Sequence, residues 1–183
     1  MMEFFKNLNL PNKLTLLRVV MIPLFVVFLY IGQHSDAFKI IALLTFCIAA
    51  ITDTLDGYIA RSKNLITNFG KFMDPLADKL LVCSALICFV EFKLLPAWVV
   101  IIIIAREFII SGFRLIAADK GVVIAASKWG KSKTVTQMIA CILLIINQPH
   151  ISFITGLFVW VMTILTVVSL VDYIIKNKGV LKD

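Results

Sequence analysis

Charged residues are scarce in this sequence: Lys, Arg, Asp and Glu make up only 16% of its 183 residues, whereas 61% are hydrophobic. The mean hydropathy is +0.99. A composition this apolar excludes an ordinary water-soluble domain and makes a lipid bilayer the expected solvent. Since a membrane-spanning helix needs roughly 20 apolar residues, the chain has room for about six spans with short connections. We expect one compact membrane domain over residues 1–183.

The sequence also lacks the patterns that disulfides and zinc sites require. All four cysteines lie within apolar stretches, with no CxxC pair and no histidine nearby: Cys47, Cys83, Cys88 and Cys141. We interpret them as small buried apolar side chains. His34 and His150 fall in connections, where a surface position is the simplest interpretation. The first residues contain no charged start followed by an apolar core and a cleavage site, so we expect them to be retained.

Apolar stretches of spanning length predict an all-α integral membrane protein with six transmembrane helices. We expect the spans at about residues 12–31, 38–61, 70–92, 96–118, 132–146 and 151–175. Asn12 is placed to cap the first span. Before it, apolar residues around Lys6 predict a short interfacial helix: Phe4, Phe5, Leu8 and Leu10.

The excess of basic residues, +7 in formal net charge, lies between the apolar stretches rather than on a soluble face. It therefore indicates topology and not nucleic-acid binding. Cytoplasmic loops collect Lys and Arg. With a cytoplasmic N-terminus, Lys39 and Lys93 would face outward and most other basic residues would lie on or near the inner face. We expect a multi-pass protein of the cytoplasmic membrane with both termini in the cytoplasm.

Several spans are apolar over only half of their length. The second turns polar at Asp53, the third is polar as far as Lys79, the fourth becomes charged from Arg106, and the fifth is polar up to Gln137. In each case the polar half is the cytoplasmic half. Charges within a span cost free energy unless they face protein or water. These halves are therefore expected to wall a polar cavity that is open to the cytoplasm.

Two pairs of aspartates flank the connection between the second and third spans. Asp53 and Asp56 are three residues apart and Asp74 and Asp78 are four apart, so each pair lies on one helix face. Both pairs lie at a similar depth, and antiparallel helices would bring all four carboxylates together. Four carboxylates this close need a cation, because like charges repel strongly in a low dielectric. One or two hard divalent ions are implied, and all-oxygen ligands suit Mg²⁺, Mn²⁺ or Ca²⁺ better than zinc.

Other interpretations of the aspartates remain open. They could be helix-end residues paired with Arg61, Lys71 and Lys79, although such pairing does not explain two acid pairs at one depth. They could line the ion path of a proton-coupled or divalent-cation transporter, since carboxylates within membranes mark such paths. A transporter would be expected to have acids or polar breaks in the outer halves as well, where spans two to five show few. A purely structural membrane subunit would leave the polar pocket unexplained.

Glycines and one arginine lie beside the acid pairs. Gly57 and Gly70 each cost about 1 kcal/mol of helix stability relative to Ala, which favours the close approach of another group to the backbone. Arg61, at the water end of its span, is placed to meet a phosphate or a polar ring. Glycines in membrane helices more often serve packing, so this interpretation depends on the aspartates.

The residues from Asp53 to Asp78 read D-x-x-D-G-x-x-A-R, eight residues, G-x-x-x-D-x-x-x-D. This pattern resembles the signature of the CDP-alcohol phosphatidyltransferase family at every position. Four segments are similar to bacterial phosphatidylglycerophosphate synthases within that family: residues 11–18, 69–79, 105–107 and 130–134. The resemblance covers most of the chain.

The resemblance implies a reaction of CDP-diacylglycerol with an alcohol, which yields a phosphodiester lipid and CMP. It implies that two metal ions, Mg²⁺ or Mn²⁺, are held by Asp53, Asp56, Asp74 and Asp78. It makes Asp78 also the base for the attacking hydroxyl. The nucleotide pocket that it implies consists of Gly57, Ala60, Arg61 and Gly70. The acyl chains of the donor would stay in the bilayer, so membrane lipid is a partner, and the family favours a homodimer.

Basic residues of the fourth and fifth spans predict a phosphorylated acceptor. Glu107, Ser111 and Arg114 share one helix face, with Arg106 a step around it. The loop and the start of the fifth span add Lys128, Lys131, Lys133, Thr134 and Gln137. Because the metals already serve the diphosphate, these cations favour a second anion. We assign the acceptor phosphate to Arg106, Arg114, Lys131 and Lys133, with Asn12, Thr15, Arg18 and Gln137 as further candidates.

Only the resemblance selects sn-glycerol 3-phosphate as the acceptor, with phosphatidylglycerophosphate as the lipid product. An inositol phosphate would satisfy the cations equally well, and phosphatidylglycerol is another alternative. A simpler interpretation of the basic residues is that Lys128 and Lys131 follow the positive-inside bias and that Arg114 pairs with Glu107.

Overall fold

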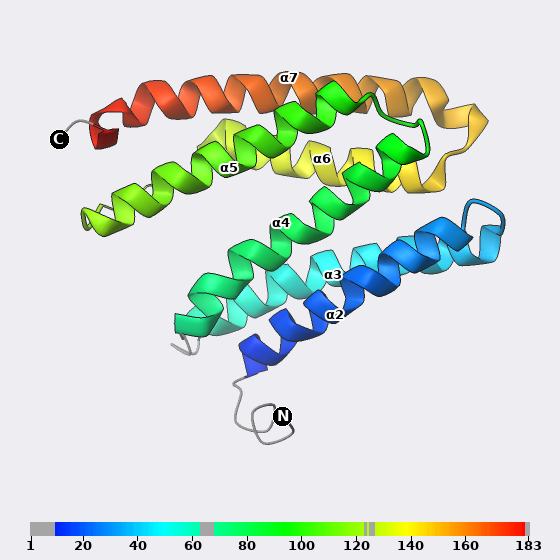
Figure 1. Ribbon diagram of the computed structural model, residues 1–183, viewed down its shortest axis with the longest axis horizontal. Helices are drawn as coiled ribbons and strands as arrows, with labels where there is room; N and C mark the ends of the chain where they lie inside the picture. The colour runs from blue at the N-terminus through cyan, green and yellow to red at the C-terminus, as the bar shows by residue number, and fades with distance from the viewer. Residues whose placement is uncertain (1–9, 63–67, 123, 125–126, 182–183) are drawn as a thin grey trace. The chain divides into compact units, whose positions relative to one another are not determined.

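The structure is a computed structural model that describes residues 10–62, 68–122, 124 and 127–181. Within these ranges it consists of helices and their connections, without a strand (Figure 1). The helices are α2 (Leu10–Ile31), α3 (Asp36–Ser62), α4 (Asn68–Glu91), α5 (Ala97–Asp119), α6 (Lys128–Ile146), η1 (Pro149–Ile151), α7 (Ser152–Asn177) and η2 (Lys178–Leu181). The all-α prediction is confirmed. The interfacial helix expected around Phe4, Phe5 and Leu8 lies outside the described residues.

The ends of the helices follow the local sequence. α6 begins at Lys128, a turn earlier than expected, because the Ser127 side chain accepts a hydrogen bond from the Gly130 backbone N–H at 3.1 Å and caps the helix. The helix ends at Asn147 in the left-handed conformation, with φ 42°, which asparagine tolerates better than most residues. α2 begins at Leu10, so Asn12 lies in its first turn and not at the cap that we expected.

Two helical segments are long and apolar enough to cross a bilayer by length and composition. Asn12–Ile31 and Pro149–Asn177 contain 18-residue stretches with mean hydropathies of 2.5 and 2.3, and only 28% and 22% of these stretches is buried. The helices also expose large apolar side chains, which suit a lipid surface better than water. On α2 these side chains recur every three or four residues: Leu17, Val20, Leu24 and Val27. These are the properties of a membrane protein.

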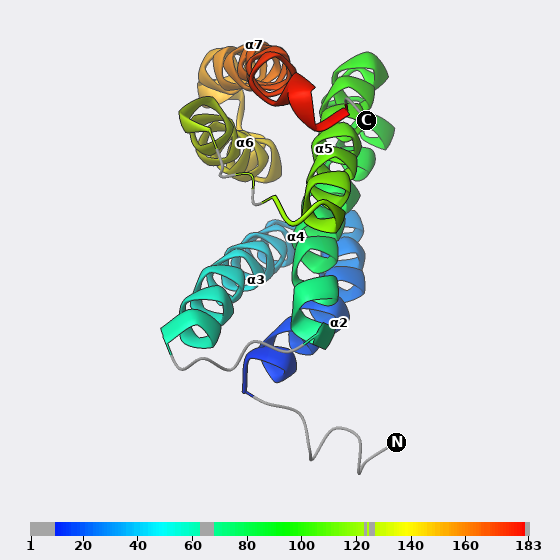
Figure 2. The same ribbon diagram turned by 90° about the vertical axis from the view of Figure 1, so that its left-hand side faces the viewer.

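The chain divides into two compact units, Met1–Cys88 and Phe89–Asp183. In the first unit, α2 packs along α3 as an antiparallel hairpin, which both ribbon views show (Figures 1 and 2). The buried residues of α2 recur every three or four positions, so one face of the helix is packed. Near the start of the helix this face is polar, and further along it is apolar: Asn12, Thr15 and Arg18, then Ile22, Phe25 and Leu29.

Aromatic and small side chains fill the contact between α2 and α3. The rings of Phe25 and Phe46 lie 5.5 Å apart between their centroids, and Ala42 and Ala49 are fully buried on α3. At the end of α2, a Cβ on Gly32 would lie 2.9 Å from the backbone nitrogen of Lys39, closer than real Cβ atoms come to other atoms. Glycine at this position therefore allows the two helices to meet at the turn.

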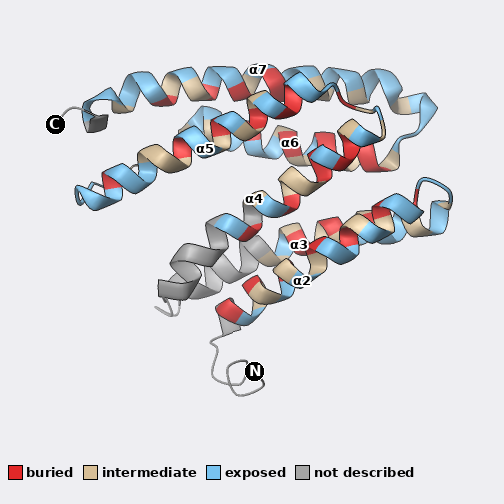
Figure 3. Cartoon of the chain, viewed as in Figure 1, coloured by how far each residue is buried: buried red, intermediate tan, exposed pale blue. Residues whose placement is uncertain are grey.

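In the second unit, α7 packs against both α5 and α6. Figure 3 shows buried residues as bands that recur along these helices between exposed ones. The buried face of α7 contains several polar side chains: Thr163, Thr166, Ser169 and Tyr173. The Thr163 and Thr166 hydroxyls each donate to a backbone carbonyl one turn earlier, at 2.7 Å. These bonds keep the hydroxyls satisfied within an apolar helix.

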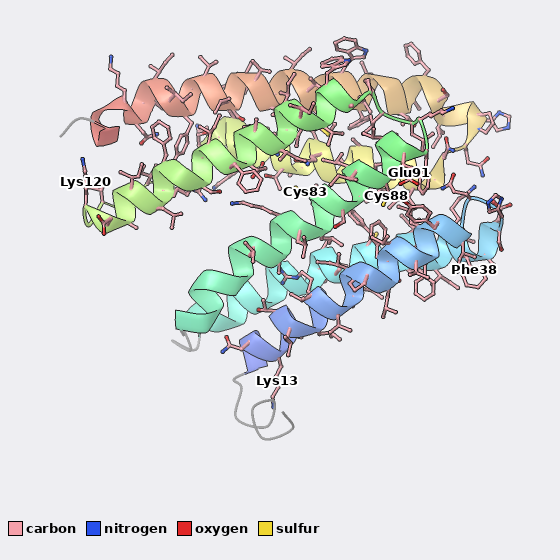
Figure 4. The ribbon with its side chains drawn as sticks, viewed as in Figure 1. Lys13, Phe38, Cys83, Cys88, Glu91 and Lys120 are labelled. Atoms are coloured by element: carbon pink, nitrogen blue, oxygen red, sulfur yellow. The ribbon has the colours of Figure 1, made fainter. Side chains whose placement is uncertain are left out.

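The four cysteines, all in the described part of the chain, form no disulfide. Cys88 and Cys141 are buried, and Cys47 and Cys83 are half-buried. Figure 4 shows Cys83 and Cys88 on α4. These positions agree with our interpretation of the cysteines as small apolar side chains.

Candidate functional site

The four aspartates lie on the two helices that flank residues 63–67. Asp53 and Asp56 belong to α3, which ends at Ser62, and Asp74 and Asp78 belong to α4, which begins at Asn68. At about 1.5 Å per residue, Asp53 and Asp78 each lie about 14 Å along their helix from these ends. The helix bounds are thus compatible with both pairs at one depth.

The side chains of the four aspartates lie outside the described residues. The same holds for the positions assigned to the nucleotide: Gly57, Ala60, Arg61 and Gly70. The metal, catalytic and nucleotide assignments therefore stay predictions.

Three polar residues of α2 are buried near the start of the helix. The exposed fractions are 5% for Asn12, 0% for Thr15 and 0% for Arg18. Their spacing of three residues places them on one face. A buried arginine in an apolar helix needs polar or charged surroundings, because the charge is otherwise costly. The burial supports their candidacy as site residues.

A cluster of charged side chains joins α5 and α6 in the second unit. Glu107 uses one carboxylate oxygen, Oε1, for two cations: Arg106 Nη1 donates to it at 2.9 Å, and Lys133 Nζ of α6 donates to it as well. The side chains are 10% exposed for Arg106, 20% for Glu107 and 2% for Lys133. Two cations and one carboxylate leave this cluster with a net positive charge. Arginine and lysine side chains are the groups that bind phosphates with charge-assisted hydrogen bonds.

α7 contributes Ser169 to the cluster, a residue that the sequence analysis missed. Arg106 Nε donates to Ser169 Oγ at 3.2 Å, and the Ser169 hydroxyl donates to the Thr166 carbonyl at 3.0 Å. Ser169 is fully buried. The signal was present in the sequence, since Thr163, Thr166 and Ser169 recur every three residues in an otherwise apolar span and so share one helix face.

Gly130 allows the start of α6 to approach Arg106. A Cβ at this position would lie 3.3 Å from Arg106 Nη2, tighter than most Cβ contacts. Arg106 Nη2 makes no hydrogen bond within the described part of the chain. The first turn of α6 carries the partial positive charge of a helix N-terminus. The N–H groups of Arg106 Nη2 and the first turn of α6 therefore lie together.

The structure brings together only part of the residues that we assigned to the acceptor phosphate. Arg106 and Lys133 meet through Glu107, whereas Arg114 and Lys131 are exposed and form no ion pair among the described residues. The alternative pairing of Arg114 with Glu107 is wrong, because Glu107 pairs with Arg106 and Lys133. Gln137, one turn beyond Lys133 on α6, is buried. The assignments of Arg106, Arg114, Lys131, Lys133 and Gln137 to the acceptor all stay predictions.

A cavity of about 490 Å³ lies at the other end of these helices, between the starts of α5 and α7 and the end of α6. Trp98 and Trp160 line it, with ring centroids 6.1 Å apart. None of the residues around this cavity is charged, and none is a predicted site residue. A phosphorylated substrate therefore fits the Glu107 cluster better than this cavity.

The family model of CDP-alcohol phosphatidyltransferase matches residues 8–169 of the chain. This range contains α2 to α6, most of α7 and every residue that we predicted for the site. The chain belongs to the CDP-alcohol phosphatidyltransferase family. The resemblance that the aspartate pattern indicated is thereby confirmed.

Several curated members of the CDP-alcohol phosphatidyltransferase family match nearly the whole chain. A CDP-diacylglycerol–glycerol-3-phosphate 3-phosphatidyltransferase of Bacillus subtilis (strain 168) is 48% identical and covers 95% of this chain and 97% of the relative. A protein of the same name from Haemophilus influenzae is 41% identical over 96% of each chain. A probable phosphatidylglycerophosphate synthase of Mycobacterium tuberculosis is 41% identical over 92% of this chain and 81% of the relative.

Proposed function

We propose that this chain transfers the phosphatidyl group of CDP-diacylglycerol to sn-glycerol 3-phosphate, giving phosphatidylglycerophosphate and CMP for phospholipid biosynthesis. Relatives that match at 48% and 41% identity carry this activity in their names. In the structure, the observation that supports a phosphorylated acceptor is that two buried cations, Arg106 and Lys133, meet at Glu107. The acceptors glycerol and serine carry no phosphate that could bind to these two cations.

Residues of α3 and α4 bind the donor and the metal ions in this proposal. The four aspartates form an all-oxygen donor set that fits Mg²⁺ or Mn²⁺, with two ions matching four carboxylate charges. Divalent cations bound there would offset the negative charge of the diphosphate and of the departing CMP. The nucleotide pocket is assigned to Gly57, Ala60, Arg61 and Gly70. In that pocket the glycines allow close approach to the backbone, and Arg61 supplies charge-assisted hydrogen bonds.

In the transfer, a hydroxyl oxygen of the acceptor attacks the phosphorus that carries diacylglycerol. A P–O bond to glycerol forms as the P–O bond to CMP breaks, and CMP leaves with the electron pair. Asp78 takes the proton of the attacking hydroxyl. Reactions of this type depend mainly on positioning and charge stabilisation, so few catalytic groups are needed.

The phosphate of the acceptor binds against Arg106 and Lys133. Lys131 and Arg114, whose side chains are exposed, attract the anion from a longer distance. Asn12, Thr15, Arg18 and Gln137 stay further candidates for contacts with the acceptor. This arrangement holds the acceptor by its phosphate and leaves its hydroxyls for the reaction.

We place the chain in the bacterial cytoplasmic membrane as one six-span domain, with both termini and the polar cavity facing the cytoplasm. A lateral opening admits the lipid donor, and a homodimer is the proposed assembly. Cysteines introduced at Lys128 and Gln148, exposed residues at the two ends of α6, test the orientation in a background without native cysteines. An impermeant maleimide should label Gln148→Cys in intact cells and Lys128→Cys only after membrane disruption. The reverse pattern would overturn the orientation.

The test of the function is an assay of the purified protein with CDP-diacylglycerol, Mg²⁺ and a panel of acceptors. The panel contains glycerol 3-phosphate, glycerol, serine, an inositol phosphate and phosphatidylglycerol. Thin-layer chromatography identifies the lipid, and CMP release measures the rate. Glycerol 3-phosphate should give phosphatidylglycerophosphate, while glycerol, which lacks only the phosphate, should give little product. A lipid formed with inositol phosphate or phosphatidylglycerol, and none with glycerol 3-phosphate, would refute the proposed acceptor.

A further inference from the structure

The half-buried Glu107 lies between Arg106 and Lys133, although a negative side chain does not itself bind phosphate. A carboxylate repels a phosphate, so its presence beside two phosphate-binding cations requires an explanation. Its Oε1 accepts hydrogen bonds from both Arg106 Nη1 and Lys133 Nζ. These cations come from different helices, and Glu107 is the side chain that connects them. Its carboxylate thereby holds the two positive groups at a fixed separation.

Arg106 is held at a second point by Ser169. The guanidinium donates from Nε to Ser169 Oγ and from Nη1 to Glu107, so two of its three nitrogens are fixed by the protein. Ser169 is itself fixed, because its hydroxyl donates to the Thr166 carbonyl. The third nitrogen, Nη2, lies at the first turn of α6 beside Gly130. The planar guanidinium is therefore oriented with its remaining N–H groups toward that turn.

We propose that Glu107 and Ser169 are positioning residues for the acceptor phosphate. Glu107 holds Arg106 and Lys133 together, and Ser169 fixes the plane of the guanidinium, so that both cations present N–H groups to one phosphate. This inference rests on the proposed use of Arg106 and Lys133 for the acceptor. It adds that the site is preorganised by two residues that do not touch the substrate themselves, which lowers the cost of ordering the cations upon binding.

The charge balance of the cluster agrees with this role. Without Glu107, two cations would lie close together with little access to water, since the Lys133 side chain is only 2% exposed. The Glu107 carboxylate between the two cations reduces their repulsion and so keeps them at one place. A competing view is that Glu107 only stabilises the fold by neutralising buried cations. On that view its removal lowers protein stability without a selective effect on one substrate.

The experiment compares Glu107→Gln, Glu107→Asp and Ser169→Ala with the unaltered protein. Glu107→Gln should raise the KM for glycerol 3-phosphate by about tenfold or more, since hydrogen bonds to charged groups contribute on the order of 1.5–3 kcal/mol. Glu107→Asp keeps the carboxylate and should recover part of this loss. Ser169→Ala should raise the same KM by roughly threefold to tenfold, as expected for one ordinary hydrogen bond. In all three variants the KM for CDP-diacylglycerol should stay within about twofold of the original value.

The matched control is Thr163→Val, which also removes a buried hydroxyl from α7 but away from the cluster. Its hydroxyl donates to the Val159 carbonyl, so the substitution should leave both KM values unchanged. Inorganic phosphate gives an independent measurement, because its inhibition constant against glycerol 3-phosphate should rise in parallel with that KM. A purely structural role would change stability without this parallel rise.

The outcomes separate this inference from the proposed function. Suppose that Lys133→Met raises the KM for glycerol 3-phosphate, whereas folded Glu107→Gln and Ser169→Ala leave this KM unchanged or lower it. Only the positioning role is then overturned. If Lys133→Met also leaves the KM for glycerol 3-phosphate unchanged, the proposed phosphate site itself is refuted. Should Glu107→Gln fail to fold, Ser169→Ala decides the question, because it changes no charge.

Discussion

Replacing Lys133 with methionine removes one buried charge of the proposed acceptor site and keeps most of the side-chain volume. The lysine side chain is 2% exposed, and its ammonium pairs with Glu107. Methionine is flexible and apolar and fills a similar space, so α6 should keep its packing. The substitution therefore tests the charge of Lys133 rather than the fold.

The expected magnitude follows from the geometry of the cluster. A hydrogen bond from a charged donor contributes about 1.5–3 kcal/mol, and about 1.4 kcal/mol corresponds to a factor of ten. The KM for glycerol 3-phosphate should thus rise by about 10- to 100-fold. The upper part of this range is favoured, because the Glu107 carboxylate would remain 2.9 Å from Arg106 and would repel the phosphate with one cation fewer beside it. The KM for CDP-diacylglycerol should change little, because the lost contact belongs to one substrate.

The assay measures initial rates of CMP release in mixed micelles with both substrates varied. Lys176→Met is the matched control, since Lys176 is 63% exposed on α7, pairs with Asp172, and should leave both KM values unchanged. Arg114→Ala removes an exposed cation and should raise the KM for glycerol 3-phosphate less than Lys133→Met does. Our reasoning would be refuted if Lys133→Met raised the KM for CDP-diacylglycerol and left that for glycerol 3-phosphate unchanged. The cluster would then bind the donor.

Three further predictions concern the metal site and the packing. Asp56→Ala should lower kcat by about a thousandfold or more, because loss of metal charge at a phosphoryl centre costs several kcal/mol. A chelator should have the same effect, and excess Mg²⁺ should reverse it. Near-normal turnover of folded Asp56→Ala would contradict the metal assignment. Gly32→Ala should lower the free energy of unfolding by about 1–3 kcal/mol. The control Gly156→Ala, whose Cβ would meet nothing within 4 Å, should leave the free energy of unfolding unchanged or raise it. Equal effects of the two substitutions would contradict the close contact at Gly32. Tyr173→Phe should leave the free energy of unfolding unchanged or raise it, because the buried hydroxyl has no hydrogen-bond partner in the described part of the chain, and a loss beyond about 1 kcal/mol would reveal a partner.

The helices could be predicted from the sequence because each apolar or half-apolar stretch forms one helix. The start of α6 was placed too late because Lys128 and Lys131 interrupt the apolar pattern on which the prediction depended. The signal for the earlier start was local and polar: Ser127 as the cap, three residues before Gly130. Asn12 was assigned to a cap that it does not form, because α2 begins two residues earlier at Leu10.

The charged cluster could be predicted only in part. The sequence grouped Arg106 with Lys133 from their polar surroundings, but it suggested Arg114 as the partner of Glu107. Helical spacing tells which residues share a face of one helix and does not tell which faces of two helices meet. Glu107 and Lys133 are 26 residues apart, and Arg106 and Ser169 are 63 apart. Such contacts depend on how α6 and α7 are rotated against α5, which local patterns do not determine.

The roles of the aspartates could be predicted from spacing and from the family resemblance, and they are still supported in that way. The structure contributes the helices that carry them, α3 and α4. The bounds of these helices are compatible with a common depth of the two aspartate pairs. The identity and number of the metal ions depend on side-chain geometry that spacing alone does not supply.

The change from polar to apolar residues along the buried face of α2 has a consequence for the electrical properties of the membrane. Beyond Arg18 the buried positions are Ile22, Phe25 and Leu29, and Phe25 contacts Phe46 of α3. An ion that entered this part would lose its hydration and find no polar side chain on the buried face of α2, at a large cost in free energy. This part of α2 therefore gives an ion no polar path from the polar start of the buried face toward the other end of the helix.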